Sequence, residues 1–119
     1  MGTIRIKRVY DPPSPGDGRR VLVDRLWPRG LKREAARIDL WFKEVAPSAE
    51  LRRWFNHEPG RWSEFQKRYR AELRGNTDGV ATLRDLVRGA RPVTLLFAAK
   101  DAEHNNAVAL RDHLSAKAG

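Results

Sequence analysis

The sequence predicts a single α/β domain over residues 1–119, built on a small, mostly parallel sheet of three to five strands covered by helices. Two apolar runs, Val21 to Val23 and Val93 to Ala99, have the composition of strands buried on both faces, and segments with helical spacing separate them. Strands that alternate with helices pair in parallel through right-handed crossovers. A chain of 119 residues can bury one such core but not two.

The first element is predicted to be an edge strand. Ile4 and Ile6 alternate with charged residues, which is the period of a strand with one buried face. The stretch from Asp11 to Gly18 holds three prolines and two glycines, and it predicts a loop that is too short to separate two domains. After this loop, Val21 to Val23 is expected to enter the sheet as a central strand.

Two helices are expected in the middle of the chain. Ser48, with Pro47 before it, is a typical N-cap for a short helix that carries Leu51. The second helix begins near Pro59 and ends at Gly75, because its apolar positions step by three or four residues. Five aromatic side chains of these helices are expected to pack into one cluster: Trp54, Phe55, Trp62, Phe65 and Tyr69.

The last third of the chain predicts helix, strand and helix. A helix is expected from about Asp78 to Arg88, ended by Gly89, and it leads into the core strand Val93 to Ala99. The closing helix is expected from about Asn105 to Ala116, with three apolar side chains on one face: Ala107, Leu110 and Leu114. The segment 37–45 fits a strand or a helix equally well.

The composition is that of a globular, strongly basic protein. Hydrophobic residues make up 40% and charged residues 33% of the chain, and the formal net charge is +9. Such a positive field attracts nucleic acid, phosphorylated metabolites or anionic membranes. The absence of cysteine excludes a disulfide, a thiol nucleophile and a thiolate metal site. Neither a signal peptide nor a membrane span is recognisable, so we expect a cytoplasmic protein that does not bind to membranes.

The first candidate site follows the strand Val21 to Val23. Ligands of parallel sheets bind beyond the carboxyl ends of the strands, and here the chain reads Asp24 to Gly30. Arginines offer a planar fork to phosphate, an indole offers a stacking face, and an acid can accept a proton. The residues proposed on this basis are Asp24 as a catalytic group and Arg25, Trp27, Arg29 and Gly30 as ligand contacts. The alternative is that Asp24 and Arg25 pair elsewhere while Trp27 fills core space.

The second candidate site follows the strand Val93 to Ala99. The chain passes through a polar loop into a helix N-terminus, whose unpaired N–H groups favour an anion. Lys100 and His104 are proposed as catalytic groups because one is a mobile cation and the other transfers protons near neutral pH. Asp101 and Asn105 are proposed as ligand contacts; the alternative is that they only cap the helix.

A third candidate is His57, which lies between the two central helices and is proposed as a ligand contact. The alternative is a turn residue with a locally bonded ring. The three histidines, His57, His104 and His113, show no i, i+4 spacing, so no metal site is predicted and no cofactor is indicated.

The chain resembles the YeaO-like family, a branch of a bacterial group of domains of unknown function. The resemblance covers nearly the whole chain and is carried by four motifs: VLVDRLWPRGL (21–31), WFKEVAPS (41–48), LRRWFNHEPGRWSEF (51–65) and VTLLFAAKDAEHNNA (93–107). It implies an α/β fold and a shared polar site, without an established reaction. The broader group often has a cysteine beside the histidine after the final strand, and this chain has His104 without one.

Two functions therefore compete. If the two central strands are neighbours, their trailing loops meet and form one site for a phosphate-like or nucleotide-like anion, in a small enzyme or a metabolite-binding protein. The alternative is non-specific binding of nucleic acid through a basic cluster early in the chain, where seven positive charges against Asp24 and Glu34 give a local charge of +5. The seven are Arg19, Arg20, Arg25, Arg29, Lys32, Arg33 and Arg37.

Overall fold

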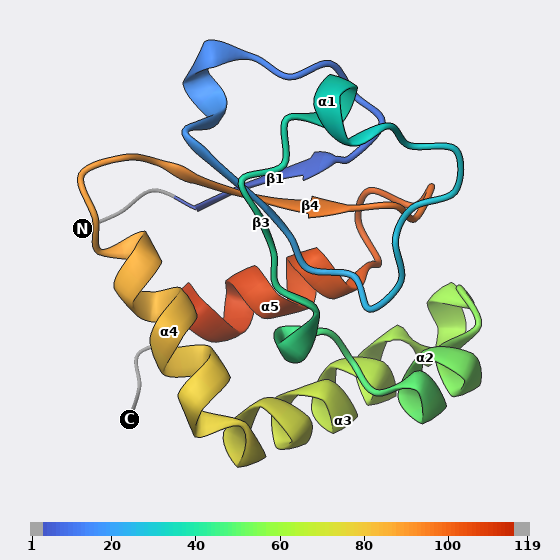
Figure 1. Ribbon diagram of the computed structural model, residues 1–119. Coiled ribbons are helices and arrows are strands. Elements are labelled where there is room, and N and C mark those ends of the chain that lie inside the picture. Colours follow the sequence, from blue (N-terminus) through green and yellow to red (C-terminus); the bar gives the residue numbers. More distant parts are fainter. Residues whose placement is uncertain (1–3, 116–119) are drawn as a thin grey trace.

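A computed structural model describes residues 4–115 and contains a four-stranded sheet in which all strands are parallel. The strands are β1 (Ile4–Arg8), β2 (Arg19–Leu22), β3 (Leu40–Trp41) and β4 (Val93–Phe97), in the order β1-β4-β2-β3. The predicted α/β class is confirmed, with β2 and β4 in the centre and β1 at an edge (Figure 1). The carboxyl ends of β2 and β4 therefore lie side by side.

Four helices cover one face of the sheet (Figure 1). They are α2 (Ala49–Phe55), α3 (Trp62–Gly75), α4 (Thr77–Val87) and α5 (Asn106–Ser115). The predicted start of each of these helices lies within one to three residues of the observed start. The predicted end of α5, at Ala116, lies outside the described residues. Short 3₁₀ turns precede β2, α2 and α3: η1 (Pro15–Asp17), η2 (Lys43–Val45) and η3 (Pro59–Arg61). None of the helices in residues 4–115 is long and apolar enough to span a membrane.

The main core lies between the sheet and these helices. Val21, Leu95 and Phe97 point into it from the two central strands, and Leu110 of α5 meets them. The predicted aromatic cluster is part of this core. Phe55, Phe65 and Tyr69 are buried, and Trp54 and Trp62 pack against them partly exposed.

The other face of the sheet has a smaller core. Val9, Leu22 and Leu96 are buried there, and the loop after β2 covers them through Trp27 and Leu31. The one-turn helix α1 (Arg33–Ala36), which the sequence pattern did not predict, lies on this side (Figure 1). Because β2 and β4 are apolar on both sides, both cores need a cover, but on this face a loop supplies most of it.

The segment 37–45 resolves into two short elements. It contributes the two-residue strand β3, whose residues pair with Val21 and Leu22 of β2, and then the turn η2. Ser48 caps α2 as predicted, since its hydroxyl accepts a hydrogen bond from the Leu51 N–H at 3.1 Å. Glu72 of α3 accepts hydrogen bonds from the Ser48 N–H and hydroxyl, which fixes α2 against α3.

A buried ion pair anchors the proline-rich loop to the sheet. The Asp17 carboxylate accepts hydrogen bonds from the Arg20 guanidinium and from the Ser14 hydroxyl, and Lys7 of β1 lies 3.1 Å from it. Asp17 is 5% and Arg20 is 3% exposed. Arg20 was expected to belong to a basic surface cluster, and this expectation is wrong because Asp17 neutralises it inside the protein. Gly18 follows at φ 64°, where a Cβ atom would collide with the Pro92 carbonyl oxygen.

Candidate functional site

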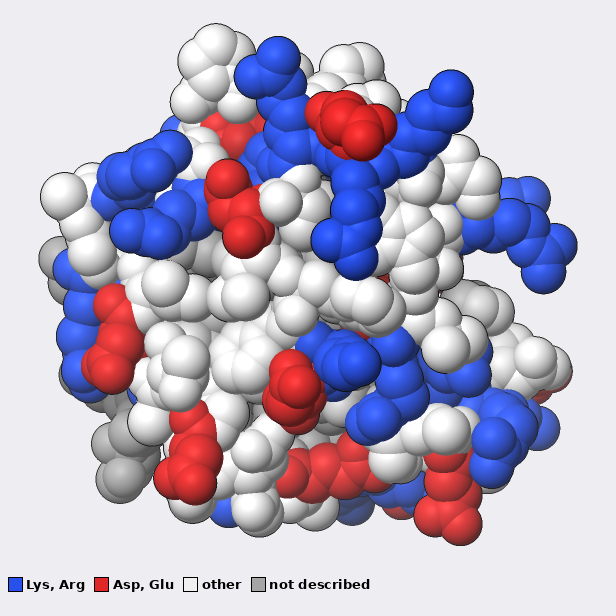
Figure 2. Space-filling view, in the orientation of Figure 1, with Lys and Arg blue, Asp and Glu red and all other residues white. Residues whose placement is uncertain are grey.

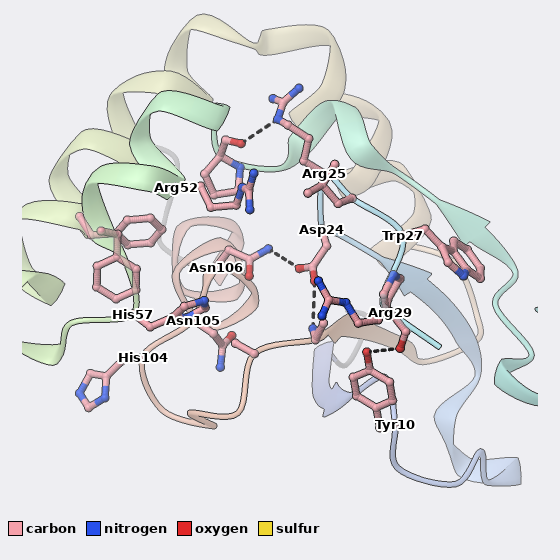
Figure 3. Close-up of a pocket in the computed structure, with 17 residues that line it drawn as sticks. Tyr10, Asp24, Arg25, Trp27, Arg29, Arg52, His57, His104, Asn105 and Asn106 are labelled. Atoms are coloured by element: carbon pink, nitrogen blue, oxygen red, sulfur yellow. Dashed lines mark hydrogen bonds between the residues drawn. The ribbon is translucent and has the colours of Figure 1, made fainter. Parts of the chain in front are cut away.

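A cavity of about 370 Å³ opens at the carboxyl ends of the two central strands. Its walls come from the loop after β2, from α2 and the turn that follows it, and from the segment between β4 and α5 (Figure 3). Seven of the ten residues proposed from the sequence line it: Asp24, Arg25, Trp27, Arg29, His57, His104 and Asn105. Lys100, Asp101 and Gly30 are not part of its lining.

Asp24 lies at the end of β2 and holds three elements together. One carboxylate oxygen accepts the Ala98 N–H at 3.0 Å, and the other accepts the Asn106 amide at 3.0 Å. The same amide donates to the Val23 carbonyl, so Asn106 joins α5 to β2. Burial raises the pKa of the Asp24 carboxyl above its usual value, although these hydrogen bonds and the nearby charge of Arg52 oppose the shift. With both oxygens bonded, Asp24 is a structural carboxylate at the base of the cavity.

Three arginines surround the opening of the cavity: Arg25, Arg29 and Arg52 (Figure 3). Within residues 4–115, Arg25 donates its Nε–H to the Pro47 carbonyl at 3.1 Å, and its two terminal nitrogens donate no hydrogen bond there. The main chain of Arg29 is fixed because the Tyr10 hydroxyl donates to its carbonyl at 2.8 Å. None of the three guanidinium groups forms an ion pair with a carboxylate of residues 4–115. Their charges are therefore available to a ligand.

Two predicted contacts of the first loop serve the fold. The Trp27 indole turns away from the cavity, donates to the Leu31 carbonyl at 2.9 Å and packs edge-on against Trp41 at 5.4 Å between ring centroids. It fills core space, which is the alternative that the sequence left open. Gly30 has φ 73°, so the turn itself favours glycine, and no atom of the described residues lies within 4 Å of its Cβ position.

The loop before α5 is organised by its own side chains. Asp101 accepts the backbone N–H groups of Glu103 and His104, and its other oxygen lies 2.9 Å from His104 Nδ1. These hydrogen bonds hold the pKa of the Asp101 carboxyl below its usual value. The Asn105 side chain caps α5 by accepting the Val108 N–H at 3.0 Å, as the capping alternative expected. Lys100 is exposed, and its ammonium group has no ion-pair partner among residues 4–115.

Aromatic rings form the wall of the cavity on the side of α2 and α3. Phe55 and Phe65 line it with their centroids 4.4 Å apart, and the exposed His57 ring lies 6.5 Å from Phe55. His57 follows Asn56 in the left-handed region, with φ values of 54° and 48°. The His104 ring lies edge-on to Trp62 at 5.4 Å. The turn after α2 thus presents an imidazole to the cavity at the cost of an uncommon backbone conformation.

Arg52 and Asn106 also line the cavity, and neither was among the residues proposed from the sequence. Arg52 projects from α2, and Asn106 begins α5. The sequence gives only a weak signal for Arg52, because α2 carries Arg52 and Arg53 side by side. Only the packing of the helix decides which of the two faces the cavity. In residues 4–115 no group of three or more histidines, aspartates or glutamates is placed to hold a metal ion.

Comparison with known proteins gives relatives over nearly the whole chain. Residues 3–118 match the model of a family described as the inactive DUF488-N3 subclade. The uncharacterized protein YeaO of Escherichia coli is 44% identical over 111 residues, which cover 93% of this chain and 96% of YeaO. The uncharacterized protein Rv3073c of Mycobacterium tuberculosis is 41% identical over 114 residues, which cover 96% of this chain and 95% of that protein. No solved structure matches.

Proposed function

The chain belongs to the YeaO-like family, within the inactive DUF488-N3 subclade, and on that premise we propose that it binds a small anion of the phosphate type. The anion occupies the cavity beyond the carboxyl ends of β2 and β4. This position is the usual ligand site of open parallel sheets.

The observation that carries the proposal is the unbalanced charge of the cavity. Arg25, Arg29 and Arg52 line it without an ion pair to the described residues, and Asp24 is the only carboxylate in its lining. Guanidinium groups bind phosphate through paired N–H donors, and such charge-assisted hydrogen bonds are stronger than neutral ones. The first residue of α5 also lines the cavity, so the positive end of this helix dipole adds to the attraction.

Binding is favoured over catalysis for this chain. The matched subclade is described as inactive, and the chain has no cysteine to act as a nucleophile. Asp24, which was proposed as a catalytic group, has both oxygens engaged in hydrogen bonds from the fold. Lys100 lies outside the lining. His104 remains beside the cavity as a polar contact for the ligand.

The nucleic-acid alternative finds less support. On the face that Figure 2 shows, Lys and Arg side chains gather over α1 and near α2, and Asp and Glu side chains lie among them. One member of the predicted basic cluster, Arg20, is buried against Asp17. A mixed surface attracts a polyanion less than a uniform one does.

Replacing Arg52 with methionine is expected to weaken the binding of inorganic phosphate by about tenfold or more, because a charge-assisted hydrogen bond is lost. The measurement is the rise in melting midpoint with phosphate, at an ionic strength held constant with chloride. Arg53→Met is the matched control, since Arg53 is also exposed on the same helix but does not line the cavity.

Equal effects of Arg52→Met and Arg53→Met would show that phosphate senses only the net charge of the surface. A parent protein whose midpoint does not respond to phosphate at all would contradict the proposal outright. Both variants are expected to melt near the parent without phosphate, because neither guanidinium group forms an ion pair in residues 4–115.

A further inference from the structure

Resting on the proposed function, we infer that the ligand is a nucleoside 5′-monophosphate. Its phosphate lies among Arg25, Arg29 and Arg52, and its base lies against the exposed ring of His57. The inference joins two features that share one cavity: a cationic opening and an aromatic wall.

The charge of the cavity selects a phosphomonoester among small anions. Three guanidinium groups and one carboxylate give the lining a net charge of +2, with the histidines counted as neutral. Asp24 counts as ionised because both of its oxygens accept N–H hydrogen bonds. A phosphomonoester carries about −1.5 to −2 charges at pH 7 and balances this lining, whereas a single carboxylate leaves half of it uncompensated.

The aromatic wall selects a planar ring on the same ligand. Phe55 and Phe65 are 6% and 2% exposed and form the buried base of this wall, with their centroids 4.4 Å apart. The exposed His57 imidazole, 6.5 Å from Phe55, supplies the ring face that a ligand can reach. Aromatic side chains bind bases of any sequence by stacking on their faces. A free phosphate or a sugar phosphate would leave this part of the cavity to water.

Two polar groups near the aromatic wall can form hydrogen bonds with the edge of a base. His104 Nδ1 is occupied by Asp101 at 2.9 Å, so Nε2 is the ring nitrogen left for a ligand. The amide nitrogen of Asn106 is spent on Val23 and Asp24, and its oxygen has no hydrogen-bond partner in residues 4–115. A heteroaromatic base offers donors and acceptors to such groups, and a plain hydrocarbon ring does not. The volume of about 370 Å³ lies in the range of small-molecule sites, about 300–1,000 Å³.

Calorimetric titration of the full chain with five probes tests the inference: AMP, UMP, ribose 5-phosphate, adenosine and inorganic phosphate. AMP is expected to bind about tenfold or more tightly than ribose 5-phosphate, since stacking is added, and similarly more tightly than adenosine, since the phosphate contacts are added. UMP is expected to share this preference over ribose 5-phosphate, because stacking tolerates any base.

Two variants and one control separate the contributions of the base and of the phosphate. His57→Asn places at this position a residue that tolerates the left-handed backbone. It is expected to lower the affinity for AMP and to leave the affinity for inorganic phosphate unchanged. Arg52→Met is expected to lower the affinity for both AMP and inorganic phosphate, and Arg53→Met is expected to lower neither affinity.

The possible failures are distinguishable. If inorganic phosphate binds in an Arg52-dependent way but AMP is no tighter than ribose 5-phosphate, the nucleotide inference is overturned and the anion site stands. The nucleotide inference is likewise overturned if His57→Asn leaves the affinity for AMP unchanged. If neither phosphate, ribose 5-phosphate nor AMP binds, the proposed function fails together with the inference.

Discussion

Replacing Asp17 with asparagine is expected to lower the free energy of unfolding by about 3–5 kcal/mol, the usual cost of removing one partner from a buried ion pair. Asparagine would leave the Arg20 guanidinium charged and only 3% exposed, with no carboxylate to neutralise it. Asparagine keeps one acceptor oxygen, so it cannot accept from Arg20, the Ser14 hydroxyl and Lys7 as the two carboxylate oxygens do. The loop that Asp17 anchors would then detach from the start of β2.

Urea denaturation of the parent and the variant measures this loss. Asp85→Asn is the control, because Asp85 forms an exposed pair with Arg88 on the surface of α4, and it is expected to change the free energy of unfolding by less than about 0.5 kcal/mol. A similarly small change for Asp17→Asn would mean that the Asp17–Arg20 pair contributes no more than a surface pair.

The same carboxylate predicts a pH dependence. Burial works to raise the pKa of Asp17, but hydrogen bonds from Ser14, Lys7 and Arg20 outweigh it and hold the pKa well below its usual value. A carboxyl whose pKa is lowered by folding contributes stability that is fully present above its unfolded value, about 3.9. The difference in stability between the parent and Asp17→Asn is therefore expected to be constant at higher pH and to shrink as the pH falls below about 4.

Replacing Asp24 with asparagine is expected to increase the affinity for inorganic phosphate by about tenfold, because it removes the one negative charge from the lining of the cavity. The same change is expected to lower the free energy of unfolding by about 1–3 kcal/mol. An asparagine has one acceptor oxygen, so it cannot accept both the Ala98 N–H and the Asn106 amide.

Calorimetric titration with phosphate measures the affinity, at a temperature where both proteins are folded. Asp112→Asn removes the same charge from the exposed side of α5, outside the cavity, and is expected to leave the phosphate affinity unchanged. A phosphate affinity that is unchanged or weaker in Asp24→Asn would mean that no anion binds beside this carboxylate.

The fold was largely predictable because its strands and helices carry strong periodic signals. Leu22 and Leu96 face one side of the sheet while Val21 and Leu95 face the other, and continuous apolar runs of this kind indicate central strands from the amino-acid order alone. The elements that the sequence did not predict are short. The two residues of β3 and the single turn α1 are defined by pairing and packing, and neither leaves a period to detect.

The candidate site was predictable only as two chain segments. Position after a central strand pointed to Asp24 and His104, because the ends of parallel neighbours meet. Side-chain direction was not readable from the sequence. Trp27 turned into the second core and Lys100 turned to solvent, whereas Arg52 came from a helix whose facing side depends on its contacts with α3.

The most direct test of the anion site is an NMR titration of the ¹⁵N-labelled chain with inorganic phosphate at constant ionic strength. The backbone amides of Arg25, Ala98 and Asn106 and the side-chain Nε–H of Arg52 are expected to shift together, with one saturable dissociation constant. Amides beside Lys32, Arg33 and Arg37 are expected to stay in place. Unsaturable shifts spread over those exposed cations, with no response at the cavity, would contradict an anion site at the carboxyl ends of β2 and β4.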